Sequence, residues 1–234
     1  MQLPKIKTPE YVIELPISKQ KVTYRPFLVR EEKMFMMLKE AKDQNLLVNN
    51  LKKIVEQCII DGPNIDDISY NDFEILFLSM RVRSMGESVD LSLKCKSCGK
   101  QSPVSINLDD VCETTKKTDI GEAKIMLNEE VGVICTPIKM SRMGQAASLT
   151  EKDTVNSVAF FIDKVFTKDQ VYTFSEMPFS EQKAFVDSLS MKHITEITQY
   201  AEKLPTASCE VDYTCASCGA KNNQIVKGLE NFFT

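Results

Sequence analysis

One short motif occurs twice in the chain, and it constrains the fold more than any other feature. The motif is Cys-x-x-Cys-Gly, and it places four cysteines at Cys95, Cys98, Cys215 and Cys218. The copies end two matching segments, residues 89–99 and 209–219, in which polar and apolar residues alternate before the first cysteine. A second short strand is expected after each copy. The pattern predicts two β-hairpins with two cysteines at each tip, which is the arrangement of a zinc knuckle.

The spacing within each motif has a physical reason. Two thiolates separated by two residues can point the same way when the chain turns tightly, and the following glycine supplies the positive φ that such turns commonly need. Two knuckles together complete a tetrahedral shell of four sulfurs, which is closed to water and suits Zn²⁺. The long stretch between the copies is no obstacle, because loop-closure entropy grows only logarithmically with length. We therefore predict one structural Zn²⁺ ion, bound by Cys95, Cys98, Cys215 and Cys218.

Two other interpretations of the cysteine pairs invoke different chemistry, namely two disulfides or redox-active dithiols. The chain has eight cysteines, and residues 1–7 lack the apolar stretch of a signal peptide. Reducing compartments keep thiols reduced, which favours metal ligands and buried thiols over disulfides. A redox pair normally lies at a helix N-terminus, where the thiol pKa is lowered, whereas these pairs are expected between strands. The zinc site is the favoured interpretation.

The remaining cysteines and the single histidine give weaker signals. Cys58 and Cys135 lie in apolar segments, so we expect both in the core. Cys112 falls in a polar stretch, and Cys209 opens the strand before the second motif. These two are substitute ligands only if the paired motif fails. His193 lies in a helical stretch with no nucleophile motif beside it, so we expect it at a helix end or on the surface.

The remaining sequence predicts an α+β fold, in which a helical body carries an N-terminal β-hairpin and a discontinuous four-Cys zinc ribbon. Alternating residues predict strands at 11–15, 21–25, 123–127 and 132–137. Apolar residues at helical spacing predict helices at 29–42, 47–59, 70–85, 154–166, 180–190 and 191–203. The third helix is expected to begin at Ser69 or Asn71 as its N-cap and to end before Gly86. Residues 108–122 are polar and are expected to be irregular.

The cysteine repeat also predicts how the chain divides into parts. Residues 1–86 form the N-terminal hairpin plus helices. Residues 87–107 join residues 208–228 in the discontinuous zinc ribbon, and residues 108–207 form an inserted hairpin and helical segment. The zinc ion would then clamp the middle of the chain to its C-terminal part.

Composition and motifs argue against catalysis. The chain has a formal net charge of −4 and 26% charged residues, which is ordinary for a globular protein. It contains no phosphate-binding glycine loop, no Gly-x-Ser-x-Gly elbow and no His-Glu-x-x-His. A catalytic zinc needs an open coordination position, whereas four cysteines close the shell. We therefore predict a protein that is not an enzyme and has no small-molecule substrate.

Nucleic-acid binding is the alternative function, because many zinc ribbons bind DNA or RNA. Residues 87–107 carry three Lys and two acidic residues, and residues 208–228 carry two of each. Neither hairpin therefore has the basic stripe that phosphate binding requires. The tips contain no aromatic residue for base stacking. The apolar runs at 75–78 and 158–162 are too short to span a bilayer, so no membrane partner is expected either.

Three segments of the N-terminal half form a recognisable set. They are Pro4-Lys-Ile-Lys-Thr-Pro9, Arg25-Pro-Phe-Leu-Val-Arg-Glu-Glu-Lys33, and residues 77–86 leading into Cys95-x-x-Cys98. The set resembles the T4-type bacteriophage baseplate hub and hub-assembly family, with the Arg-Pro-Phe-x-Val-x-Glu-Glu-Lys run as its most specific element. The resemblance covers the N-terminal half well and is vaguer from residue 108 to residue 206.

The resemblance implies a non-enzymatic role in building the central hub of a contractile tail's baseplate, as a component or as an assembly factor. Its partners are then other phage tail and baseplate hub proteins. The place of action is the host cytoplasm during assembly, and the virion's tail baseplate as well if the protein stays in the finished particle.

A run of large apolar residues adds a feature that fits such a role. Met34, Phe35, Met36 and Met37 cannot all lie on one face of a helix. Either part of the run is exposed and available to a partner, or the helix is buried on two sides.

Overall fold

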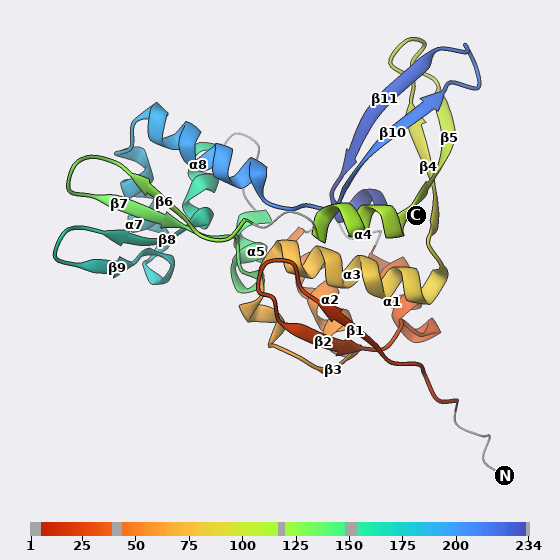
Figure 1. Ribbon diagram of the computed structural model, residues 1–234, viewed down its shortest axis with the longest axis horizontal. Helices are drawn as coiled ribbons and strands as arrows, with labels where there is room; N and C mark the ends of the chain where they lie inside the picture. Colours follow the sequence, from red (N-terminus) through yellow and green to blue (C-terminus); the bar gives the residue numbers. More distant parts are fainter. Residues whose placement is uncertain (1–5, 39–43, 117–119, 148–153, 233–234) are drawn as a thin grey trace.

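A computed structural model describes residues 6–38, 44–116, 120–147 and 154–232 of the chain. Residues 4 and 5 of the segment Pro4–Pro9 lie outside this part. The described part combines helices with four small antiparallel sheets, so the predicted α+β class is confirmed. In Figure 1 a helical body lies at the centre, a second lobe extends to the left, and two long hairpins project side by side at the upper right.

The N-terminal hairpin forms as predicted and gains a third strand. Strand β1 (Tyr11–Glu14) pairs with β2 (Lys21–Tyr24), and β2 also pairs with β3 (Ile59–Asp61). The sequence pattern placed Ile59 at the end of a helix, but that helix, α2 (Gln44–Glu56), ends earlier. The amide of Arg25 donates to the carbonyl of Cys58 at 2.9 Å, and this bond brings the chain after α2 into the sheet.

The predicted helix with the methionine run is α1 (Val29–Leu38), and residues 39–42 of that prediction lie outside the described part. Phe35 is buried in the body, whereas Met36 and Met37 are 69% and 75% exposed. Part of the run is therefore exposed, and the alternative of a helix buried on two sides is wrong.

The central helix of the body is α3 (Tyr70–Met85), and it is buried on nearly all sides. Ser69 caps it by accepting from the Asp72 amide at 3.0 Å, and Gly86 ends it with a φ of 92°, as predicted. Asp72 is fully buried and accepts from the amides of Ile17 and Ser18 at 2.8 and 3.0 Å. This carboxylate therefore fixes the N-terminal hairpin's turn to α3.

Two further polar residues of α3 hold the chain where it returns from the second lobe. The side-chain amide of Asn71 donates to the carbonyl of Pro205 at 2.7 Å, and Glu74 accepts from the amide of Ala207 at 3.0 Å. Both side chains are buried, and a buried polar group without such a partner would be costly. The two bonds set the position at which the second cysteine hairpin begins.

The polar stretch at 108–122 is not irregular, which corrects the prediction. It contains helix α4 (Leu108–Lys116), while residues 117–119 lie outside the described part. The side chain of Asn107 accepts from the Asp109 amide at 2.8 Å, and acidic residues in the first turn favour the helix dipole. Leu108, Val111 and Cys112 form a buried stripe on the body. Cys112 is therefore a core residue and not a loop residue.

The second lobe contains a four-stranded antiparallel sheet in the order β6-β7-β8-β9. Its strands are β6 (Ala123–Met126), β7 (Gly132–Cys135), β8 (Ile162–Phe166) and β9 (Val171–Thr173). The predicted hairpin is confirmed as β6 and β7. The helix predicted at 154–166 is wrong, because only a short α6 (Thr154–Ser157) and a 3₁₀ turn, η3 (Val158–Phe161), precede β8. The apolar residues of this segment fit the period of a helix as well as that of a strand. Pairing with β7 makes Ile162–Phe166 a strand.

The described part has three other α-helices, α5 (Met140–Ala147), α7 (Phe179–Asp187) and α8 (Met191–Lys203). The pair α7 and α8 confirms the prediction, whereas α5 was not predicted. His193 lies in the first turn of α8, where its ring and Ser190 form a reciprocal capping box, so the expected helix-end position is confirmed. Within the described ranges, none of the helices combines the length and hydropathy that a bilayer crossing requires.

Candidate metal centre

Both cysteine motifs lie at the tips of long hairpins with the same register. The strands are β4 (Ser88–Lys94) with β5 (Gln101–Asn107), and β10 (Ser208–Thr214) with β11 (Lys221–Lys227). Lys94 pairs with Gln101 in the first hairpin, and Thr214 pairs with Lys221 in the second. Figure 1 shows the two hairpins lying side by side with their tips at the same end. The predicted hairpins are therefore present.

The alternation of polar and apolar residues explains why the hairpins meet. Val89 and Leu91 of β4, together with Val211 and Val226 of the second hairpin, are buried and belong to the same hydrophobic core as the helical body. The residues between them along each strand are exposed. Burial of these inward residues brings the hairpins together along their length, and the tips are carried to one place.

The two tips have nearly identical backbone geometry. The amide of Cys95 donates to the carbonyl of Lys100 and the amide of Cys215 to that of Ala220, each at 2.9 Å. The glycines that follow the motifs have φ values of 72° and 71°, in the left-handed region that favours glycine. The expected reason for glycine at these positions is confirmed, and each turn points both of its cysteines toward the other hairpin's pair.

The four sulfurs lie within 4.8 Å of one another. Across the two tips, the sulfur of Cys95 is 3.8 Å from that of Cys218, and the sulfur of Cys98 is 3.7 Å from that of Cys215. A regular tetrahedron with the Zn–S distance of about 2.3 Å has edges of about 3.8 Å. The donor set and its spacing therefore fit a cation of this size. All eight cysteines of the chain are free thiols.

The backbone of each turn also supports thiolates. The amides of Ser97 and Ser217 each lie 3.4 Å from the sulfur of the first cysteine of their motif. The Cys98 amide is the largest cause that lowers the pKa of Cys95, with the Ser97 amide and a side-chain bond adding to it. Such donors stabilise the charged form, which is the form that binds a metal.

Two polar side chains add donors that the sequence analysis did not find. The hydroxyl of Ser102 and the side-chain amide of Asn222 each donate to a cysteine sulfur at 3.4 Å. Ser102 is the largest cause that lowers the pKa of Cys215 to about 6. A signal for Ser102 exists in the sequence, because the other inward positions of its strand, Val104 and Ile106, are apolar. Asn222 could be found as the residue at the equivalent position of the second copy.

The charge of the cluster itself limits how many thiols can ionise. The Ala220 amide lowers the pKa of Cys218, but bonds with the other cysteine sulfurs and burial outweigh it and raise the pKa to about 12. Negative charges so close together repel one another, which opposes ionisation of Cys218 while no cation is bound. A divalent cation would remove this penalty and could hold all four as thiolates.

The other cysteines lie outside the cluster. Cys58 and Cys135 are fully buried, and burial raises the pKa of the first to about 11 and of the second to about 12. Burial also raises the pKa of Cys209. The expectation that Cys58 and Cys135 are core residues is confirmed, and neither Cys112 nor Cys209 is one of the clustered thiols.

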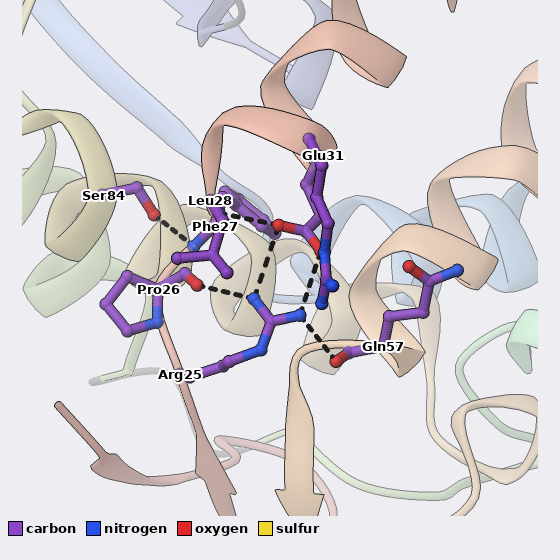
Figure 2. Close-up of polar contacts among 8 residues, drawn as sticks. Arg25, Pro26, Phe27, Leu28, Glu31, Gln57 and Ser84 are labelled. Carbon is purple, nitrogen blue, oxygen red and sulfur yellow. Dashed lines mark hydrogen bonds and ion pairs between the residues drawn. The ribbon is translucent and has the colours of Figure 1, made fainter. Parts of the chain in front are cut away.

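A second polar cluster surrounds Glu31, in the segment that carries the most specific family resemblance (Figure 2). Glu31 is fully buried, and it accepts from Arg25 at 3.0 Å and from Arg30 at 2.6 Å. It also accepts from the Leu28 amide at 2.7 Å, and Arg25 donates to the carbonyl of Gln57 at 2.9 Å. Burial alone raises the pKa of Glu31, but these bonds outweigh it and the pKa is lowered.

The rest of that segment also has a structural role. The Phe27 amide donates to the hydroxyl of Ser84 at 2.7 Å, which ties the segment to the end of α3 (Figure 2). The ring of Phe27 packs against Phe35 and Phe77, with centroids 4.9 and 5.4 Å apart. The segment therefore forms a buried corner that joins the N-terminal sheet, α1 and α3.

Comparison with known proteins gives a consistent result over most of the chain. A family model described as T4 bacteriophage base plate protein matches residues 8–234. The baseplate hub assembly protein gp26 of Enterobacteria phage T4 is 21% identical over 225 residues, which cover 96% of this chain and 98% of that protein. No solved structure matches the chain. The chain belongs to the T4 bacteriophage base plate protein family.

Proposed function

We propose that the protein is a non-enzymatic structural or assembly protein of the baseplate hub in a contractile phage tail, and that one structural Zn²⁺ ion joins its two knuckles. The family match over residues 8–234 supports the baseplate role. The hub role is taken from the relative named as a hub assembly protein, which aligns along nearly its full length. Its partners are then other tail and baseplate hub proteins, met in the host cytoplasm during assembly.

The observation that carries the zinc proposal is the distance between sulfurs on opposite hairpins. Cys95, Cys98, Cys215 and Cys218 come from two distant segments, and the cross-hairpin separations of 3.7 and 3.8 Å equal the edge of a zinc–thiolate tetrahedron. Structural Zn²⁺ sites contribute about 10–16 kcal/mol in zinc-finger peptides near neutral pH. An ion here would fasten the C-terminal hairpin to the middle of the chain.

The same geometry favours a structural ion over a catalytic one. Four cysteines complete the tetrahedral shell, so a bound ion would keep no open position for water or substrate. Each pair lies in a turn between two strands and not at a helix N-terminus, which is where redox-active pairs usually lie. Both features are typical of an ion that stabilises the fold.

A phage that lacks this protein tests the baseplate role directly. We expect electron micrographs of infected cells to show incomplete baseplates without hubs, and we expect the wild-type protein supplied from a plasmid to restore them. Normal baseplates in the absence of the protein would contradict the role. Mass spectrometry of purified particles then separates two forms of the proposal, because an assembly factor is found only in the lysate and a component is found in the particle.

A further inference from the structure

Two polar side chains lie buried between the cysteine hairpins. Ser102 is 1% exposed and Asn222 is 6% exposed. Each is the second residue of the strand that leaves its own knuckle, β5 for Ser102 and β11 for Asn222. The two residues therefore occupy equivalent positions in the repeat, although they differ in type.

The bonds of these two side chains cross from one hairpin to the other. Ser102 of the first hairpin donates to Cys215 of the second, and Asn222 of the second donates to Cys95 of the first. In each case the acceptor is the first, buried cysteine of the opposite motif. The exchange is reciprocal, so each hairpin stabilises a thiolate that belongs to the other.

Asn222 makes further bonds that hold its side chain in one orientation. Its carbonyl oxygen accepts from the Lys96 amide at 3.0 Å, and its amide nitrogen donates to the carbonyl of Ala220 at 2.9 Å. One position further along the inward face of β11, Gln224 donates to the carbonyl of Lys94 at 2.8 Å. The hairpins are thus tied together at the tip by bonds between protein atoms alone.

We infer that Ser102 and Asn222 are positioning residues of the four-cysteine cluster, which hold the two tips in register and fix the sulfurs of Cys215 and Cys95 before a metal ion enters. The inference rests on the proposed metal role of these cysteines. Its physical basis is that hydrogen bonds to the ligands orient them and stabilise their charged form. A site assembled in this way binds metal without first having to bring the hairpins together.

The inference predicts the effect of removing each donor. Ser102→Ala and Asn222→Ala should each weaken Zn²⁺ binding by about 10- to 100-fold, the usual effect of losing a partner that orients a ligand. Asn222→Asp keeps the shape and the acceptor but lacks the donor, so it should weaken binding as well. Matched controls are Ser105→Ala and Asn223→Ala, on the exposed faces of the same two strands.

Competition with a chelator under reducing conditions measures the Zn²⁺ affinity of each variant. Substitution with Co²⁺ gives a second readout, because the energy of sulfur-to-metal charge transfer depends on hydrogen bonding at the sulfur. Loss of the donor to Cys215 in Ser102→Ala raises the energy of the sulfur lone pairs, so the charge-transfer band should move to longer wavelength. The band of Ser105→Ala should match that of the wild type.

The outcomes separate this inference from the proposal on which it rests. If the wild type binds one metal ion and the three variants bind it like their controls, with an unshifted Co²⁺ band, the positioning role is overturned and the metal site stands. If the wild type binds neither Zn²⁺ nor Co²⁺, the metal site itself is overturned, and the inference fails with it.

Discussion

Glu31 is a fully buried carboxylate that joins the first sheet to the start of α1. Its principal partner is Arg25, whose side chain is 12% exposed. Replacing one member of a buried ion pair is strongly destabilising, because the other charge stays buried without compensation. The neighbouring Glu32 differs in environment, since one of its carboxylate oxygens is buried without a hydrogen-bond partner. Adjacent residues of one motif are therefore expected to respond differently to the same substitution.

Glu31→Gln should lower the free energy of unfolding at neutral pH by about 3 kcal/mol, the lower end of what a broken buried pair costs. Urea unfolding monitored by circular dichroism measures this change. Glu32→Gln is the matched control, and it should have a smaller effect because Glu32 is only partly buried and one of its carboxylate oxygens has no hydrogen-bond partner to lose. Equal losses in the two variants would contradict the role that we assign to Glu31.

The contribution of the Glu31–Arg25 pair to the free energy of unfolding should decrease in acid. The pKa of Glu31 is lowered from its ordinary value of 4.5, so the charged form stabilises the folded state above that value. This stabilisation is lost as the pH falls through the lowered pKa of the folded state. The difference in unfolding free energy between the wild type and Glu31→Gln should therefore shrink in acid. A difference that stays constant from neutral to strongly acidic pH would show that the charge is not its source.

At the scale of single elements, the cysteine hairpins could be predicted because three signals agree. They are the alternation of polar and apolar residues, the Cys-x-x-Cys motif and the glycine that follows it. The segments that were mispredicted carry conflicting signals. The segment 154–166 fits a helix or a strand by its apolar pattern, but its middle forms the 3₁₀ turn η3 and pairing with β7 makes Ile162–Phe166 a strand. Helix α4 has only a narrow apolar stripe among polar residues. Its packing on the helical body therefore contributes more to its formation than its own composition does.

One glycine in the sheet of the second lobe lies against an aromatic ring. Gly132 of β7 lies beneath the ring of Phe166 in β8, and a Cβ atom at this position would overlap that ring. The ring is also contacted by Lys124, whose nitrogen lies 4.3 Å from the ring centroid. Because strands β6, β7 and β8 all meet at this point, the glycine permits the close approach of the ring to the backbone.

Gly132→Ala should lower the free energy of unfolding by about 1–3 kcal/mol, the usual cost of forcing extra volume into a packed site. Thermal or urea unfolding measures the loss. Adding Phe166→Leu removes the ring, so the double variant should lose less than the sum of the two single losses. Strict additivity would indicate that the ring and the glycine do not interact as described.

For the whole molecule, the two hydrophobic clusters support a proposed division of the chain. We propose that the second lobe is the core of the inserted segment, residues 108–207, because all the buried residues of the second cluster lie within it, although Ile17 packs against the cluster from outside. Some parts of that segment pack elsewhere, since Leu108 of α4 and Met140 of α5 belong to the body cluster. Residues at the C-terminal end, including Leu229 and Phe232, join the body cluster as well. The inward residues of the ribbon and the residues that follow it therefore share one core.

Removal of the metal should act unequally on these parts. Treatment of the reduced protein with a chelator is expected to increase hydrogen exchange in β4, β5, β10 and β11, because the tips lose their common ion. The strands of the second lobe, β6 to β9, serve as an internal control and should keep their protection. Uniform loss of protection, or no change in the ribbon, would contradict a local role for the ion.

Some residues of the metal site can be predicted from the sequence, and others can be found only in the structure. The four ligands could be predicted because their types and spacing are dictated by coordination chemistry. Ser102 and Asn222 could have been found from their inward positions, but their crossed bonds required the two hairpins to be placed together. Buried polar contacts such as that of Glu74 with Ala207 join residues far apart in the chain, and no local pattern indicates them.

Metal content of the purified, reduced protein tests the central claim most directly. Native mass spectrometry should find one zinc ion per chain in the wild type and none in a variant with Cys98→Ser and Cys218→Ser. That result would agree with sulfurs held within 4.8 Å of one another by two hairpins from distant parts of the chain. A wild-type protein that carries no zinc when fully reduced, or two ions per chain, would contradict it.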